Sequence, residues 1–209
     1  MSIENMKIAV VTGEHPFQEK EFDAVFESMD GIEFVREDLA DFAKDPDREH
    51  YESVVFYNFH RKNPDPETTE AILSLGNKGQ GLVILNHAIL AFPEWDEFIP
   101  ICGIEDRGFG YHIGERLKVH VADADHPITA GVTDWEMTDE IYSMKSPGED
   151  SHVLLTTDHP KSMEVIGWTR TYRNSRVLCF ESGHDNDTYA VPQFREVLTR
   201  GIKWVAGRE

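Results

Sequence analysis

The feature that most constrains the fold is an alternation of short apolar runs with amphipathic segments in the first half of the chain. The apolar runs, which we predict to be β-strands, cover residues 7–12, 32–36, 53–58 and 81–86. Between the first two runs, Phe22, Val25, Phe26 and Met29 recur at the spacing of one helical face. Strands and helices that alternate in this way form βαβ units, so the sequence predicts an α/β fold with a mainly parallel sheet.

The second half changes in character near Arg116. Strand candidates follow one another there with little helix between them, at residues 117–121, 151–156, 164–168 and 176–181. Some antiparallel strands on one side of the sheet are therefore expected. Apolar residues from Phe194 to Val205 then predict a closing helix. No linker or internal repeat interrupts the chain, so we predict a single domain over residues 1–209.

Charge and hydropathy exclude several classes of partner. The chain has 20 Lys and Arg residues against 39 Asp and Glu residues, a formal net charge of −19. Such a surface repels phosphate backbones, so we expect neither nucleic-acid binding nor binding to an anionic membrane. No apolar run approaches the roughly 20 residues of a membrane span, and residues 1–7 lack the layout of a secretory signal. These features predict a cytoplasmic protein with reduced thiols.

Common catalytic and nucleotide-binding motifs are missing from the sequence. It contains no Gly-x-Gly-x-x-Gly fingerprint, no Walker phosphate loop and no Gly-x-Ser-x-Gly elbow. Of the two cysteines, Cys179 lies inside an apolar predicted strand, and Cys102 does not follow a strand in the manner of an exposed nucleophile. We therefore predict that neither cysteine is catalytic.

Histidines carry the strongest signal for a site. Of the ten in the chain, four directly follow predicted strands, namely His15, His60, His87 and His184. Because ligands bind at the carboxyl ends of parallel strands, we expect these four side chains to share one crevice. Asp185 follows His184, and histidine beside a carboxylate suits general acid–base catalysis. The same donors also suit a divalent metal such as zinc, and the sequence leaves this alternative open.

Aromatic and acidic residues supply further candidates. Trp95 is expected either to wall the pocket or to pack in the core. The segment Asp139–Tyr142 alternates polar and apolar residues, which is typical of an edge strand. Glu140 and Tyr142 on this strand either point into the crevice or belong to a solvated face, and we expect Asp139 to be solvated.

Eight segments share their order and spacing with a known family over roughly the last 130 residues. They are Gly81–His87, Phe92–Trp95, His126–Gly131, Asp139–Tyr142, Gly167–Thr169, Ser175–Leu178, Ser182–Asp185 and Gly201–Trp204. In these segments the chain resembles the trehalose-utilisation (ThuA-like) family. The resemblance implies a fold like the class I glutamine-amidotransferase domain, a flavodoxin-like three-layer sandwich. Amidotransferases have a nucleophilic cysteine at the turn after the fourth strand, where this chain has Asn86 and His87. An amidotransferase reaction is therefore not expected.

The resemblance also implies a function in the use of trehalose or related disaccharides. On this basis we expect a hydrolase, lyase or isomerase acting on a sugar derivative. The candidate catalytic residues are His184, His87 and Asp185, and the candidate substrate-binding residues are His15, His60, Asn86, Trp95, Glu140 and Tyr142. The alternative is a non-catalytic carbohydrate-binding or regulatory protein. Assembly into a homo-oligomer is left open.

Overall fold

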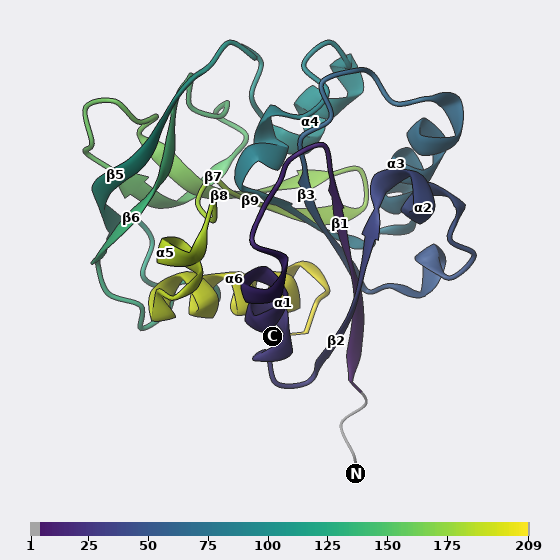
Figure 1. Ribbon diagram of the computed structural model, residues 1–209, viewed down its shortest axis with the longest axis horizontal. Coiled ribbons are helices and arrows are strands. Elements are labelled where there is room, and N and C mark those ends of the chain that lie inside the picture. The colour runs from purple at the N-terminus through teal and green to yellow at the C-terminus, as the bar shows by residue number, and fades with distance from the viewer. Residues whose placement is uncertain (1–4, 209) are drawn as a thin grey trace.

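A computed structural model describes residues 5–208 and contains one nine-stranded sheet of order β2-β1-β3-β4-β9-β8-β7-β5-β6 (Figure 1). The strands are β1 (Met6–Gly13), β2 (Ile32–Asp38), β3 (Ser53–Asn58), β4 (Gly81–Leu85), β5 (Gly110–Val121), β6 (Trp135–Ser143), β7 (His152–Thr157), β8 (Val165–Tyr172) and β9 (Ser175–Phe180). The five strands predicted for the parallel part of the sheet all form, and β6 lies at the sheet edge.

The sheet is mixed, with the antiparallel strands gathered on one side as expected, although they make up a larger share than a mainly parallel sheet would have. Strands β2, β1, β3, β4 and β9 pair in parallel. From β9 onward, β8, β7, β5 and β6 pair antiparallel. The physical reason is connectivity, because parallel neighbours need a long crossover whereas antiparallel neighbours need only a turn. The second half of the chain supplies few helices, so its strands pair by turns.

Helices cover both faces of the sheet. They are α1 (Glu19–Glu27), α2 (Leu39–Lys44), α3 (Pro66–Lys78), α4 (Ile99–Cys102), α5 (Asn186–Tyr189) and α6 (Pro192–Val205), with 3₁₀ turns at Arg48–His50, Asn86–Leu90 and Asp96–Phe98. Helices α1, α5 and α6 lie together in the lower part of Figure 1, whereas α4 lies at its top and α2 and α3 at its right. This arrangement is the expected three-layer sandwich.

Local sequence explains where the main helices begin and how closely they pack. Helix α3 begins at Pro66, and the side chain of Asp65 accepts a hydrogen bond from the backbone N–H of Thr68 at 2.7 Å. Helix α6 packs closely on β9, because a Cβ atom at Gly201 would lie only 2.1 Å from Cδ2 of Leu178. Among residues 5–208, no helix combines the length and apolar character that a membrane crossing requires.

Candidate functional site

A pocket of about 260 Å³ lies at the carboxyl edge of the parallel strands, where the loops after β1, β3, β4 and β9 meet. It is lined by His15, Phe59, His87, Leu90, Phe109, Tyr111, Ile113, Glu140, Tyr142 and His184. The rings of His15 and His87 stack with centroids 4.2 Å apart, and the ring of His184 lies 5.5 Å from that of His15. Three of the four predicted histidines therefore converge, as the positions of the strands predicted.

The structure places the fourth histidine, His60, outside this pocket. Its ring packs beside Gly13 and stacks on Phe92 with a centroid distance of 6.1 Å. The neighbouring Phe59 lines the pocket, whereas the ring of His60 contacts Phe92 and is hydrogen-bonded to the side-chain amide of Asn58.

The carboxylate partner of His184 is Glu140, which comes from β6. Oε2 of Glu140 lies 3.1 Å from Nδ1 of His184, a close ion pair rather than an aligned hydrogen bond, and accepts a hydrogen bond of 2.6 Å from the hydroxyl of Tyr142. Asp185, the predicted partner, instead accepts a hydrogen bond from the N–H of Asp187 and caps α5. An aspartate that begins a helix uses its carboxylate on the helix itself, which corrects the expected pairing.

Electrostatics favour the charged forms of this pair. The contact with Glu140 raises the pKa of His184 above its usual value and outweighs the opposing effect of burial. Burial raises the pKa of Glu140, but its contacts with His184 and Tyr142 together hold that pKa below its usual value. The site therefore favours the protonated form of His184, which faces the pocket, and the ionised form of Glu140.

His15 has the opposite shift. Burial and the nearby charge of His184 lower its pKa, with Glu140 acting in the other direction. Two neighbouring imidazoles in the same pocket therefore have pKa values shifted in opposite directions. Titratable groups whose environments push their pKa values apart are typical of an acid and a base that work together.

His87 has a different environment from the other two histidines. It is 2% exposed, and burial together with the nearby His15 lowers its pKa to about 3. Asn86 donates to the carbonyl of Glu181 at 2.7 Å, which directs its own Oδ1 toward Nδ1 of His87 at 2.9 Å. A neutral, buried ring is poorly suited to donate protons at neutral pH. The environment of His87 therefore suits a ring that forms part of the pocket wall and stacks on His15 better than the predicted catalytic role.

Asn86 occupies the turn at which related folds expose a nucleophile. Its φ of 50° is in the left-handed region, but its side chain is fully buried and hydrogen-bonded within the protein.

Trp95 lies away from the pocket, because its ring packs against Phe92 and Phe98 with centroids 5.6 and 6.4 Å apart. Of the two alternatives weighed for Trp95, the structure shows core packing.

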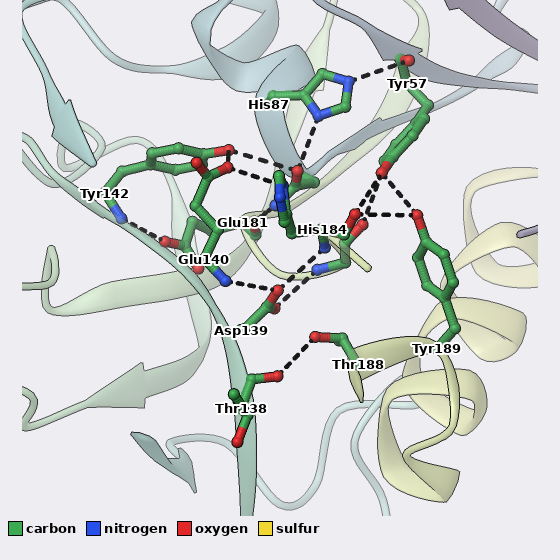
Figure 2. Close-up of polar contacts among 12 residues, drawn as sticks. Tyr57, His87, Thr138, Asp139, Glu140, Tyr142, Glu181, His184, Thr188 and Tyr189 are labelled. Atoms are coloured by element: carbon green, nitrogen blue, oxygen red, sulfur yellow. Dashed lines mark hydrogen bonds and ion pairs between the residues drawn. The ribbon is translucent and has the colours of Figure 1, made fainter. Parts of the chain in front are cut away.

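Asp139 is buried, at 1% exposure, which corrects the expected solvated face. Its carboxylate accepts hydrogen bonds from the backbone N–H groups of Gly183 and His184 at 2.9 and 3.0 Å (Figure 2). Burial raises its pKa to about 6 against the effect of these bonds. The strand face is covered because α5 packs on β6, where the hydroxyl of Thr188 donates to the carbonyl of Thr138. Asp139 thus fixes the loop that presents His184.

Two further features of the site were missed in the sequence. Tyr111 and Ile113 at the pocket are 59% and 60% exposed, and their alternation along β5 is the signal that could have identified them. Glu181 is fully buried, and its Oε1 accepts from the N–H of Tyr142, whereas Oε2 has no hydrogen-bond partner among the described residues. Burial raises the pKa of Glu181 well above its usual value. No pattern in the sequence identified Glu181 as a residue of the site.

The arrangement of possible zinc ligands and the burial of the two cysteines bear on two further chemistries that the sequence suggested or excluded. Within residues 5–208, no group of three or more His, Cys, Asp or Glu side chains is arranged to hold a metal ion. Both cysteines are free and fully buried, and burial raises the pKa of the Cys179 thiol well above its usual value.

We predict that iodoacetamide at neutral pH labels both cysteines of the native protein more slowly than free cysteine, because both side chains are fully buried and burial also raises the pKa of Cys179. Mass spectrometry of the labelled protein measures the rate, and protein unfolded in guanidinium chloride is the control that should react quickly. Native labelling faster than that of free cysteine would contradict the prediction.

Comparisons with known proteins show which family and which solved structures this chain is similar to. Residues 7–205 match the model of the ThuA family, described as trehalose utilisation. A ThuA-like protein of Parabacteroides merdae ATCC 43184 has a similar structure, with a TM-score of 0.78, 24% identity, and coverage of 97% of this chain and 90% of that one. For a ThuA-like protein of Bacteroides uniformis ATCC 8492 the TM-score is 0.74 and the identity 18%, with 96% and 91% covered.

The amidotransferase-like fold is also supported. A protein of Thermoplasma acidophilum that is named as part of a GMP synthase aligns with a TM-score of 0.58 and 13% identity over 97% of this chain and 95% of that one. A search of curated proteins gives no significant match. The family match covers nearly the whole described chain, and its segments build the sheet and the pocket. This chain therefore belongs to the ThuA, or trehalose-utilisation, family.

Proposed function

We propose that this protein is an enzyme that acts on a sugar derivative by proton transfer between His184, His15 and the substrate. The observation that carries the proposal is a pair of histidines with centroids 5.5 Å apart in one pocket, whose surroundings shift their pKa values in opposite directions. Hydrolases, lyases and isomerases that act on sugars all need a group that donates a proton and a group that accepts one.

Each residue has a distinct part in this proposal. His184 donates a proton to a substrate oxygen, and Glu140 keeps the imidazole charged until it does so. His15 accepts a proton from the substrate, because its lowered pKa leaves it neutral at physiological pH. Tyr142 orients Glu140 through its hydroxyl group.

The shape of the pocket supports a sugar as the substrate. Its volume of about 260 Å³ lies just below the roughly 300–1,000 Å³ typical of ligand pockets, which suits one ring-sized group. Phe59 and Phe109 supply flat apolar walls, and the exposed ring of Tyr111 lies at the pocket. A second ring of a disaccharide would extend from the pocket toward Tyr111.

A non-catalytic sugar-binding protein is the alternative function. Asn86 favours it, because the elbow of this fold holds a buried amide in place of a nucleophile. The alternative gives no function to the opposed pKa shifts of His15 and His184. Binding alone needs hydrogen bonds and apolar walls but no proton donor of raised pKa.

The test is turnover of a panel of keto-disaccharides, followed by NMR of the products. We expect conversion of at least one compound by the wild-type protein and loss of about 10²-fold or more in His184→Gln, as typical for removal of a general acid. His60→Gln is the matched control, since His60 lies outside the pocket and should keep full activity. Binding without conversion would favour the alternative, and unchanged turnover by His184→Gln would refute the role of His184.

A further inference from the structure

The pocket has a cationic rim in a strongly acidic chain. The guanidinium carbon of Arg61 lies 5.1 Å from the ring centroid of Phe59 and 5.2 Å from that of Phe109, and both rings line the pocket. Nη1 of Arg61 also donates to the carbonyl of Leu90, another lining residue. Two aromatic faces and a carbonyl therefore hold this cation beside the pocket.

Arg107 lies on the same side of the site. Its Nη2 donates to the carbonyls of Ile89 and Ala91 at 2.6 and 2.9 Å, which ties it to the loop that supplies Leu90. Burial and the charge of Arg107 lower the pKa of Arg61, so the two guanidinium groups act on each other. Two like charges that repel each other make this rim attractive to an anion.

The two arginines of the rim differ from six arginines elsewhere in the chain that are paired with carboxylates. Arginines that form ion pairs with carboxylates are Arg36, Arg116, Arg170, Arg173, Arg200 and Arg208. Within residues 5–208, neither Arg61 nor Arg107 has a carboxylate within 4.0 Å, although the chain has 39 acidic residues. The positive charges of Arg61 and Arg107 are therefore not neutralised by a neighbouring carboxylate of the described residues.

Some hydrogen-bond donors of Arg61 have no acceptor among the described residues. Its Nη1 is used on Leu90, while Nε and Nη2 make no hydrogen bond to another described residue. A guanidinium presents Nε–H and Nη2–H side by side, in the geometry that a carboxylate or a phosphate accepts. An exposed Arg61 with this edge unoccupied is suited to a ligand rather than to the fold.

We propose that the substrate of this site carries an anionic group, a carboxylate or a phosphate, which Arg61 binds at the rim while the sugar ring enters the pocket. This inference rests on the proposed function, because it assigns the charge class of the same substrate. Arg107 adds attraction at longer range, since its Nη2 is used on two backbone carbonyls and its Nη1 donates to the sulfur of Cys102.

The experiment compares three probes of similar ring shape, glucose, glucuronate and glucose 6-phosphate, by isothermal titration calorimetry. We expect wild-type protein to bind at least one of the two anions about tenfold more tightly than glucose, as one charge-assisted pair provides. Arg61→Gln should lose this preference and bind glucose unchanged, and Arg61→Lys, which keeps the charge without the fork, should be intermediate. Arg200→Gln is the control, because it removes the same charge from α6.

Glucuronate and glucose 6-phosphate distinguish a carboxylate from a phosphate as the anionic group of the substrate. Preference for glucuronate alone would identify a sugar acid, and preference for glucose 6-phosphate alone a sugar phosphate. Equal affinity for all three probes, or an anion preference kept by Arg61→Gln, would overturn this inference and leave the proposed function standing. Failure of all three to bind or to shift the NMR signals of His15 and His184 would overturn the proposed sugar function together with the inference.

Discussion

Replacing Glu140 by glutamine should lower the pKa of His184 and reduce turnover by about 10²–10⁴-fold, the range typical of general acid–base catalysis. The contact with Glu140 is the largest effect that raises this pKa, and burial of the ring acts against it. Glutamine is similar in shape but carries no charge, so burial would then dominate. At neutral pH the imidazole would lose the proton that the proposed reaction uses.

NMR titration of the histidine ring signals measures this pKa without any substrate. Glu136→Gln is the matched control, because Glu136 lies on the same strand and pairs with the exposed Arg116. We expect the control to leave the titration of His184 unchanged. A His184 that titrates in Glu140→Gln as it does in the wild-type protein would show that another group sets its charge.

The same pair makes stability depend on pH. Because the folded pKa of His184 lies above 6.5, its contribution to stability is complete below about pH 6.5 and is lost as the pH rises through the folded value. Because the folded pKa of Glu140 lies below 4.5, its contribution is complete above about pH 4.5 and is lost as the pH falls through the folded value. The two contributions are therefore complete together between about pH 4.5 and 6.5.

The fold and the histidine cluster could be predicted because they depend on patterns local to each strand. Apolar runs identified β1, β3 and β4, and the rule that parallel strands end at one edge brought His15, His87 and His184 together. The same rule failed for His60, because it locates the end of a strand and does not specify which side a loop residue faces.

The carboxylates of the site could not be predicted in this way. Strand β6 lies at the far edge of the sheet, yet Asp139 and Glu140 reach the loop that follows β9. That approach depends on how the antiparallel half of the sheet pairs and curves, which no local pattern encodes. The neighbouring Asp185 was therefore the obvious partner for His184 in sequence, although its carboxylate caps a helix in the structure.

Replacing Asp139 by alanine should have the largest effect on stability, a loss of about 3–5 kcal/mol. Its carboxylate accepts from the N–H groups of Gly183, His184 and Glu140, and each buried donor left without an acceptor costs about 1–3 kcal/mol. The loss would be a large share of the 5–15 kcal/mol that typically stabilises a folded domain. Asp139→Asn keeps one carbonyl oxygen and should lose less, about 1–2 kcal/mol.

Urea unfolding at pH 7, followed by tryptophan fluorescence, measures these changes, and Asp158→Ala is the control because that carboxylate is 83% exposed. The loop that Asp139 holds is also tied from its other side, where the hydroxyl of Tyr57 donates to the carbonyl of Gly183 at 2.9 Å. The loop should therefore loosen rather than detach in Asp139→Asn, and the NMR signals of His184 should broaden while the protein stays folded. If Asp139→Ala were as stable as the control, the loop would be held by Tyr57 and packing alone, and His184 would owe its position to β9 rather than to β6.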